Sequence, residues 1–211
     1  MVKALLVNGS PHKAGCTHTA LELVGGALRE SGIEADEFWI GAKPIAGCIG
    51  CYRCAELGQC VVEDDTVEEF LEVACGYDAF VFGSPVYVSG VAGSMKCFMD
   101  RSFFSNPGRV DFALKPAAVV ASARRAGTTA TLEQLEKHLQ HQQMVQVNSR
   151  YWPMVHGNTP DEVMRDEEGV QVMQQLGRNM AWLMKSIEAA RAAGVEPPAQ
   201  PAQRIGTNFI R

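Results

Sequence analysis

Short runs rich in apolar residues alternate with amphipathic segments along most of the chain. The first run, residues 2–8, is almost continuously apolar, which is typical of a strand buried on both faces of a parallel sheet. The pattern predicts further strands at 35–40, 79–83, 117–122 and 144–148.

Between these strands, apolar residues recur every three or four positions, as they do on the buried face of a helix. Thr17 is a suitable N-cap for the first helix, and Thr66 forms a capping box with Glu69 at the start of the second. The other apolar stripes consist of Val91, Met95, Phe98 and Met99, of Leu132, Leu135 and Leu139, and of the segment from about 169 to 192.

Five strand-then-helix units predict an α/β fold, a doubly wound parallel sheet of five strands in the order 2-1-3-4-5 with helices on both faces. A length of 211 residues suits one large domain with an appended arm. We therefore expect a domain over residues 1–193, which contains the loop 48–60, and an extended, proline-bearing tail over 194–211. Ligands of such sheets bind beyond the carboxyl ends of the strands, so four loops are expected at one edge: 9–17, 48–60, 84–87 and 123–128.

Composition narrows the class of protein. Seven cysteines in 211 residues are too few for a disulfide-stapled scaffold. The formal net charge of −5, with both signs mixed along the chain, argues against nucleic acid as a partner. No signal peptide is recognisable at the start, and no apolar run reaches the roughly 20 residues that a membrane span requires. We expect a protein of the reducing cytoplasm, without a membrane partner.

The first predicted strand runs into a glycine-bearing loop, 9–17, directly before a helix. Free backbone N–H groups and the helix dipole make such a junction a site for an anion, and the hydroxyls of Ser10 and Thr17 flank it. The glycine spacing matches neither the nucleotide P-loop nor G-x-G-x-x-G, which disfavours ATP and a Rossmann-type dinucleotide. A phosphomonoester fits better, and a plain surface turn is the alternative.

Four cysteines fall within thirteen residues, in the spacing C-x2-C-x2-C-x5-C. A tight loop of thiolates with this spacing suits one 4Fe–4S cluster. Zinc held by four thiolates and a dithiol–disulfide pair are the alternatives. Cys75 and Cys97 fall in predicted helices, where a buried packing thiol is the default. The candidate metal ligands are therefore Cys48, Cys51, Cys54 and Cys60.

Together these motifs resemble those of the NAD(P)H-dependent FMN reductase superfamily, which has a flavodoxin-like fold, and especially its iron–sulfur flavoprotein branch. The resemblance covers nearly the whole chain. The matching pieces are Gly9-Ser10-Pro11 through Gly15 and Thr17, the cysteine run ending in residues 61–65, Gly83-Ser84-Pro85-Val86-Tyr87 with Lys96, Asp100 and Arg101, and residues 124–128.

The resemblance implies FMN as a cofactor, with the redox chemistry on the flavin and no catalytic side chain assigned. His12 stands where the family usually has Arg, so Lys13 is expected to supply phosphate charge, and Cys16 stands where Asn is common. The residues implied on the phosphate side are Ser10, His12, Lys13, Cys16 and Thr17. Those implied beside the isoalloxazine ring are Pro85, Val86, Tyr87, Ala123, Arg124, Arg125 and Gly127.

Three functions follow from these observations. The first is an FMN-dependent oxidoreductase or electron-transfer flavoprotein with a 4Fe–4S cluster next to FMN, which passes electrons from a low-potential donor such as ferredoxin, or from NAD(P)H, to a small acceptor. The second is a cluster-free NAD(P)H-dependent FMN or quinone reductase. The third is a non-catalytic FMN carrier or a zinc-stabilised interaction module. The resemblance also implies a homodimer or homotetramer, in which Trp152 would cover a neighbour's flavin, while His156 is expected to be a plain loop histidine.

Overall fold

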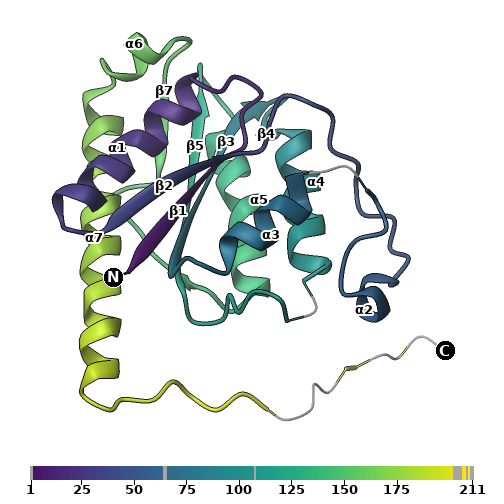
Figure 1. The fold of residues 1–211 in the computed structure, drawn as a ribbon. Helices are drawn as coiled ribbons and strands as arrows, with labels where there is room; N and C mark the ends of the chain where they lie inside the picture. The colour runs from purple at the N-terminus through teal and green to yellow at the C-terminus, as the bar shows by residue number, and fades with distance from the viewer. Residues whose placement is uncertain (1, 64–65, 107, 202–205, 208, 210–211) are drawn as a thin grey trace.

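The structure is a computed structural model that describes residues 2–63, 66–106, 108–201, 206–207 and 209. A twisted parallel sheet lies between two layers of helices (Figure 1). The predicted tail, 194–211, lies partly outside the described residues. None of the described helices is long and apolar enough to cross a membrane.

The sheet has the strand order that the sequence predicts. Its five parallel positions run β2-β1-β3-β5-β6, which is 2-1-3-4-5 once the short antiparallel β4 is left out of the count. The strands are β1 (Lys3–Asn8), β2 (Glu34–Trp39), β3 (Ala79–Tyr87), β5 (Pro116–Ala123) and β6 (Val145–Gln146). The flavodoxin-like doubly wound fold is thereby confirmed.

The fifth position differs from the prediction, because it is filled by two short strands. β6 pairs with the beginning of β5, and β7 (Met154–His156) pairs with its end. Pro153 lacks an amide hydrogen and stands immediately before β7, which fits the interruption. The prediction of a single strand over 144–148 was therefore too long, because β6 has only two residues. His156, which was expected in a loop, lies in β7.

β3 continues four residues further than predicted and ends in a hairpin. Tyr87 pairs with Gly90 of β4 (Gly90–Val91), so the connecting turn is Val88–Ser89. Both turn residues have positive φ, 48° and 58°, as the type I′ turn of a two-residue hairpin requires. The hairpin extends one wall above the carboxyl ends of the strands.

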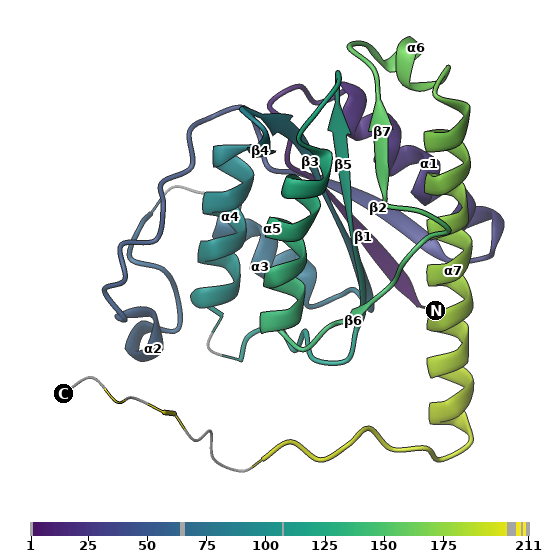
Figure 2. The ribbon, with the colours of Figure 1, turned by 180° about the vertical axis from the view of Figure 1, so that it is seen from behind.

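Helices cover both faces of the sheet (Figure 2). α1 (Cys16–Glu30) and α7 (Glu167–Ala192) pack together on one face, and α3 (Thr66–Ala74), α4 (Gly93–Phe104) and α5 (Thr128–His141) cover the other. Two single turns, α2 (Cys54–Leu57) and α6 (Pro160–Val163), lie in the connecting loops.

The core beneath α3 and α4 is built from aromatic rings. Phe70 of α3 contacts Phe98 of α4 with ring centroids 5.1 Å apart, and Phe103 of α4 contacts Phe112 at 5.1 Å. Edge-to-face pairs of this kind add stability beyond the buried area. They fix α4, which adjoins the loop after β1 at its start and the cysteine stretch at its end.

Candidate functional site

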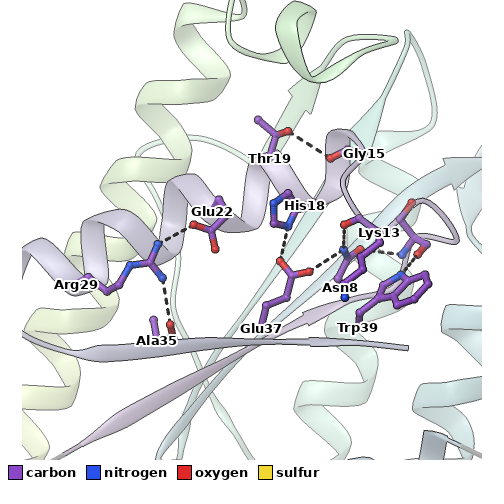
Figure 3. Close-up of polar contacts among 11 residues, drawn as sticks. Asn8, Lys13, Gly15, His18, Thr19, Glu22, Arg29, Ala35, Glu37 and Trp39 are labelled. Carbon is purple, nitrogen blue, oxygen red and sulfur yellow. Dashed lines mark hydrogen bonds and ion pairs between the residues drawn. The ribbon is translucent and has the colours of Figure 1, made fainter. Parts of the chain in front are cut away.

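The loop after β1 is held in shape by its own hydrogen bonds (Figure 3). Asn8 Oδ1 accepts from the Ser10 amide at 3.0 Å, and Asn8 Nδ2 donates to the Lys13 carbonyl at 3.1 Å. Ser10 Oγ accepts from the His12 amide at 3.1 Å, and the Gly15 amide donates to the His12 carbonyl at 3.1 Å. The loop is therefore ordered before any ligand binds.

Gly9 is required by a close approach between β1 and β3. Its amide donates to the Gly83 carbonyl at 2.8 Å. A Cβ at this position would lie 2.5 Å from Met95 Sδ and 2.6 Å from the Gly83 oxygen. The glycine thus lets the loop sit directly on the end of β3 and on α4.

A group of polar residues stands behind the loop (Figure 3). Glu37 accepts from Asn8 Nδ2 at 3.1 Å and lies 2.6 Å from His18 Nδ1. Trp39 Nε1 donates to the Ser10 carbonyl at 2.7 Å, and Lys13 Nζ lies 5.5 Å from the centre of the Trp39 ring. The Lys13 ammonium is thus held on the β2 side of the loop by a cation–π contact.

The first turn of α1 faces the same loop. Within the described chain, Gly15 is the N-cap and no side chain caps its amides, and the first turn carries no acidic residue. Thr17 is therefore inside the helix and is not its N-cap. Uncapped amides at the positive end of a helix dipole are suited to an anion, so the structure has the arrangement on which the predicted anion site depends.

A cavity of about 440 Å³ opens in front of this helix end, at the carboxyl ends of β1, β3 and β5. Its size is within the range of roughly 300–1,000 Å³ typical of sites for small molecules and cofactors. Nine of the residues expected around FMN line it: Ser10, His12, Cys16, Thr17, Pro85, Val86, Tyr87, Ala123 and Arg124.

Three residues expected in the site do not line this cavity. Lys13 lies on Trp39. Arg124 and Arg125 are both exposed, and of the two only Arg124 lines the cavity. Gly127, at φ 94°, instead supports the wall from behind, since a Cβ there would lie 2.6 Å from Ser89 Cα and 2.7 Å from Val86 Cγ1.

The sequence reasoning missed five lining residues: Gly15, Ser122, Gly157, Asn158 and Pro160. Ser122 could have been found, because it stands at the end of a predicted strand beside the expected flavin loop. The last three of these residues follow β7, and β7 was not predicted.

Two buried hydroxyls join the first loop to β5. Thr17 Oγ1 and Ser122 Oγ lie 2.8 Å apart, and both residues are almost fully buried. Cys16 Sγ donates to the Gly157 carbonyl at 3.6 Å. Burial raises the pKa of the Cys16 thiol, so the side chain is a neutral thiol at neutral pH and does not repel an anion.

A second, smaller cavity contains the cysteine stretch. Its walls come from the loop 48–62 and from the last turn of α4, and its volume is about 20 Å³. All four candidate ligands line it: Cys48, Cys51, Cys54 and Cys60. Arg101, Phe104 and Ser105 form the opposite wall, and the Tyr52 ring contacts the Phe104 ring at 5.7 Å.

The cysteine cavity has the ligand types of a metal site, but its sulfur atoms are not close enough together to hold a metal ion. Among the described residues, no group of three or more His, Cys, Asp or Glu side chains is arranged to hold a metal ion. The volume is close to the roughly 10–15 Å³ that one water molecule needs. Four thiols around one cavity fit an iron–sulfur cluster by their chemistry, and the loop must open to admit one.

The two cavities lie apart, which corrects the expectation that all four loops meet at one edge. They share no lining residue. Met95, near the start of α4, adjoins the first loop, whereas Phe104, at its end, adjoins the cysteines. α4 has 12 residues, and at 1.5 Å per residue it is about 18 Å long. The descending path of the loop is visible in Figures 1 and 2.

Comparison with known proteins assigns the family. The family model for NADPH-dependent FMN reductases matches residues 2–159. The chain belongs to this family. It is therefore an FMN-binding oxidoreductase flavoprotein, and the 440 Å³ cavity at the carboxyl ends of the strands has the place and size expected for its cofactor site.

Two curated proteins are similar to this FMN reductase family member in sequence, and a solved structure shares its fold. An iron–sulfur flavoprotein of Methanocaldococcus jannaschii is 31% identical over 197 residues, which cover 89% of this chain and 100% of that protein. A second iron–sulfur flavoprotein of the same organism is 28% identical and covers 82% and 92%. The crystal structure of a WrbA-like flavodoxin from Agrobacterium tumefaciens superposes with a TM-score of 0.63 at 18% identity, covering 88% and 99%.

Proposed function

We propose that this chain is an electron-transfer oxidoreductase that carries FMN and a 4Fe–4S cluster on Cys48, Cys51, Cys54 and Cys60. It would pass electrons from a low-potential donor such as ferredoxin, or from NAD(P)H, to a small acceptor. The observation that carries the cluster is that all four cysteines line one cavity. The names of the relatives from M. jannaschii agree with it.

FMN would bind with its phosphate at the start of α1. The uncapped amides of the first turn and the hydroxyls of Ser10 and Thr17 supply donors there, without an acidic side chain in the first turn to oppose them. Pro85, Val86 and Tyr87 would lie against the ring. When bound, the flavin supplies the two-electron and one-electron chemistry. Arg124 would stabilise negative charge on the reduced flavin.

The cluster would use the loop's capacity to rearrange. Gly50 and Gly58 have positive φ, 63° and 73°, and a Cβ added at either glycine would meet no atom of the described residues within 4 Å. The stretch between them is mostly exposed. Such a loop can open around a cluster at small cost, because few buried contacts are lost.

We also propose a homo-oligomer, because the two sites of one chain are separated by the length of α4. Ile49 and Tyr52, in the cysteine loop, are 72% and 70% exposed, and Val88, next to Tyr87 of the flavin cavity, is exposed as well. Exposed apolar side chains at both sites fit contact with a second copy, whose cysteine loop would approach the flavin. A monomer in sedimentation at micromolar concentration would contradict this.

A cluster-free NAD(P)H-dependent FMN or quinone reductase is the second candidate. The observation in its favour is that the cysteine sulfurs of the described chain are not gathered around a metal position. A zinc-stabilised module would use the same cysteines.

The deciding measurement is the content of iron, acid-labile sulfide, zinc and FMN per chain after anaerobic purification. We expect one FMN, four iron and four sulfide per chain. Near-zero iron and sulfide with one FMN selects the cluster-free reductase, and one zinc selects the zinc module. Reduction rates with reduced ferredoxin and with NADPH, compared in the same preparation, then identify the donor.

A further inference from the structure

One wall of the cysteine cavity is a buried positive charge. Arg101, in the last turn of α4, is 1% exposed and is the largest fully buried side chain of the described residues. Its Nη2 donates to the Val62 carbonyl at 3.1 Å, and its Nε lies 3.4 Å from Cys60 Sγ. Removing a guanidinium from water is costly unless the site provides acceptors. One of the acceptors here is a cysteine sulfur.

Cys60 is held at both its backbone and its side chain. Its amide donates to Glu68 Oε1 of α3 at 3.1 Å, and Glu68 also forms an ion pair with Arg109. Its sulfur faces Arg101 of α4. Two helices of the core therefore fix Cys60 before any group binds.

The first and third cysteines have weaker supports. Cys48 Sγ accepts from the Gly50 amide at 3.5 Å within its own loop, and Cys54 Sγ donates to the Phe104 carbonyl at 3.7 Å. Cys60 is thus the ligand candidate that is already held by side chains of the helical scaffold.

From this geometry we propose that Arg101 is a positioning residue of the cysteine site. It holds the Cys60 sulfur at the cavity, and it raises the reduction potential of the cluster that the four thiolates bind. One-electron reduction adds one negative charge beside the guanidinium, so the N–H···S bond and the positive charge stabilise the reduced form more than the oxidised form. The inference rests on the proposed cluster and adds a determinant of its potential.

The test compares Arg101→Gln and Arg101→Lys with Arg178→Gln, which makes the same charge change on the exposed side of α7. The midpoint potential of the cluster is measured by EPR-monitored titration. At a fixed ambient potential, Arg101→Gln should lower the ratio of reduced to oxidised cluster about tenfold, which is about 59 mV for a one-electron couple. Arg101→Lys keeps a charge and should shift less, and Arg178→Gln should not shift.

FMN content and the thermal unfolding midpoint show whether each variant is folded. Because Arg101 is buried, its replacement can unfold the chain. A second measurement therefore uses the wild-type protein and needs no variant. In protein labelled with ¹⁵N-arginine, pulsed EPR of the reduced cluster should detect a weak coupling to one arginine nitrogen.

The outcomes separate this inference from the proposed function. A wild-type protein without iron and sulfide refutes the cluster and this inference together. A wild-type cluster whose potential is the same in Arg101→Gln as in Arg178→Gln refutes the role of Arg101 alone. Absence of the arginine coupling in the wild-type cluster refutes it independently of any variant.

Discussion

Replacing Thr17 by alanine removes a hydroxyl from the wall of the flavin cavity. Thr17 is 1% exposed and its Oγ1 lies 2.8 Å from Ser122 Oγ, so its position is fixed before FMN binds. A hydrogen bond to a charged group contributes about 1.5–3 kcal/mol. Since about 1.4 kcal/mol corresponds to a factor of ten in Kd, Thr17→Ala should weaken FMN binding about 10- to 100-fold.

The hydrogen bond between Thr17 and Ser122 allows a second prediction, on the Kd of Ser122→Ala. A hydroxyl donates one hydrogen and accepts two, so Ser122 can donate to Thr17 while Thr17 donates to the phosphate. Ser122→Ala would then leave the phosphate contact in place and remove only its support. Its effect on Kd should be clearly smaller, about threefold to fivefold, and the double variant should be less than additive because the two residues are in contact.

The assay is titration of apo-protein with FMN, followed by quenching of flavin fluorescence at fixed ionic strength. Thr17→Ser keeps the hydroxyl and should bind FMN almost as wild type does. Thr19→Ala makes the same change two residues along α1, where the hydroxyl donates to the Gly15 carbonyl at 3.3 Å and does not line the cavity. If folded Thr17→Ala binds FMN within threefold of Thr19→Ala, the phosphate does not lie at this helix end.

Three further outcomes follow from the structure. Gly9→Ala should lower the free energy of unfolding by at least about 2 kcal/mol, because the added Cβ would collide with the Gly83 carbonyl oxygen and with Met95. Gly26→Ala, which adds a Cβ into open space within a helix, should raise it by about 0.5–1 kcal/mol. Thermal melts compare the two variants. Arg124→Gln should weaken FMN binding and Arg125→Gln should not, because only Arg124 lines the cavity. Equal losses of FMN affinity in the two titrations would contradict this assignment. Burial, followed by a hydrogen bond to the Asp36 carboxylate, raises the pKa of Tyr77 to about 12. The contribution of Tyr77 to stability is therefore present below about pH 10 and is lost as the pH rises towards 12. A spectroscopic alkaline titration in which all tyrosines ionise together near pH 10 would contradict this.

The order of the sheet and most of the flavin cavity could be predicted from the sequence. The reason is that both depend on local patterns: apolar runs mark the buried strands, and the residues that follow a parallel strand must emerge at its carboxyl end. Nine of the twelve expected flavin-site residues line one cavity for this reason.

The errors have a common physical origin in tertiary contacts. The sequence could not show that Trp39 would attract the Lys13 ammonium, since the pairing joins two separate segments of the chain. It could not show the division of the fifth strand either, because β7 has three residues and is defined by its pairing with β5.

The position of the cysteine loop is the largest difference between the sequence-based prediction and the structure. The loop 48–60 follows a strand that ends at the flavin edge, but its course depends on contacts made far along the chain. The Arg101–Cys60 and Phe104–Tyr52 contacts hold it at the other end of α4. Residues 64–65, which connect it to α3, lie outside the described residues.

The two borders of the sheet limit how copies of this protein can meet. One border is β2, whose six residues include Glu34, Asp36 and Glu37. The other is divided into β6 and β7, with only two and three paired residues. Acidic side chains and short, interrupted strands both discourage an incoming strand from continuing the hydrogen-bond ladder. The sheet is therefore protected against edge-to-edge growth, which leaves the helices and loops, with the proposed flavin cavity and the cysteines, as the surfaces through which copies can associate.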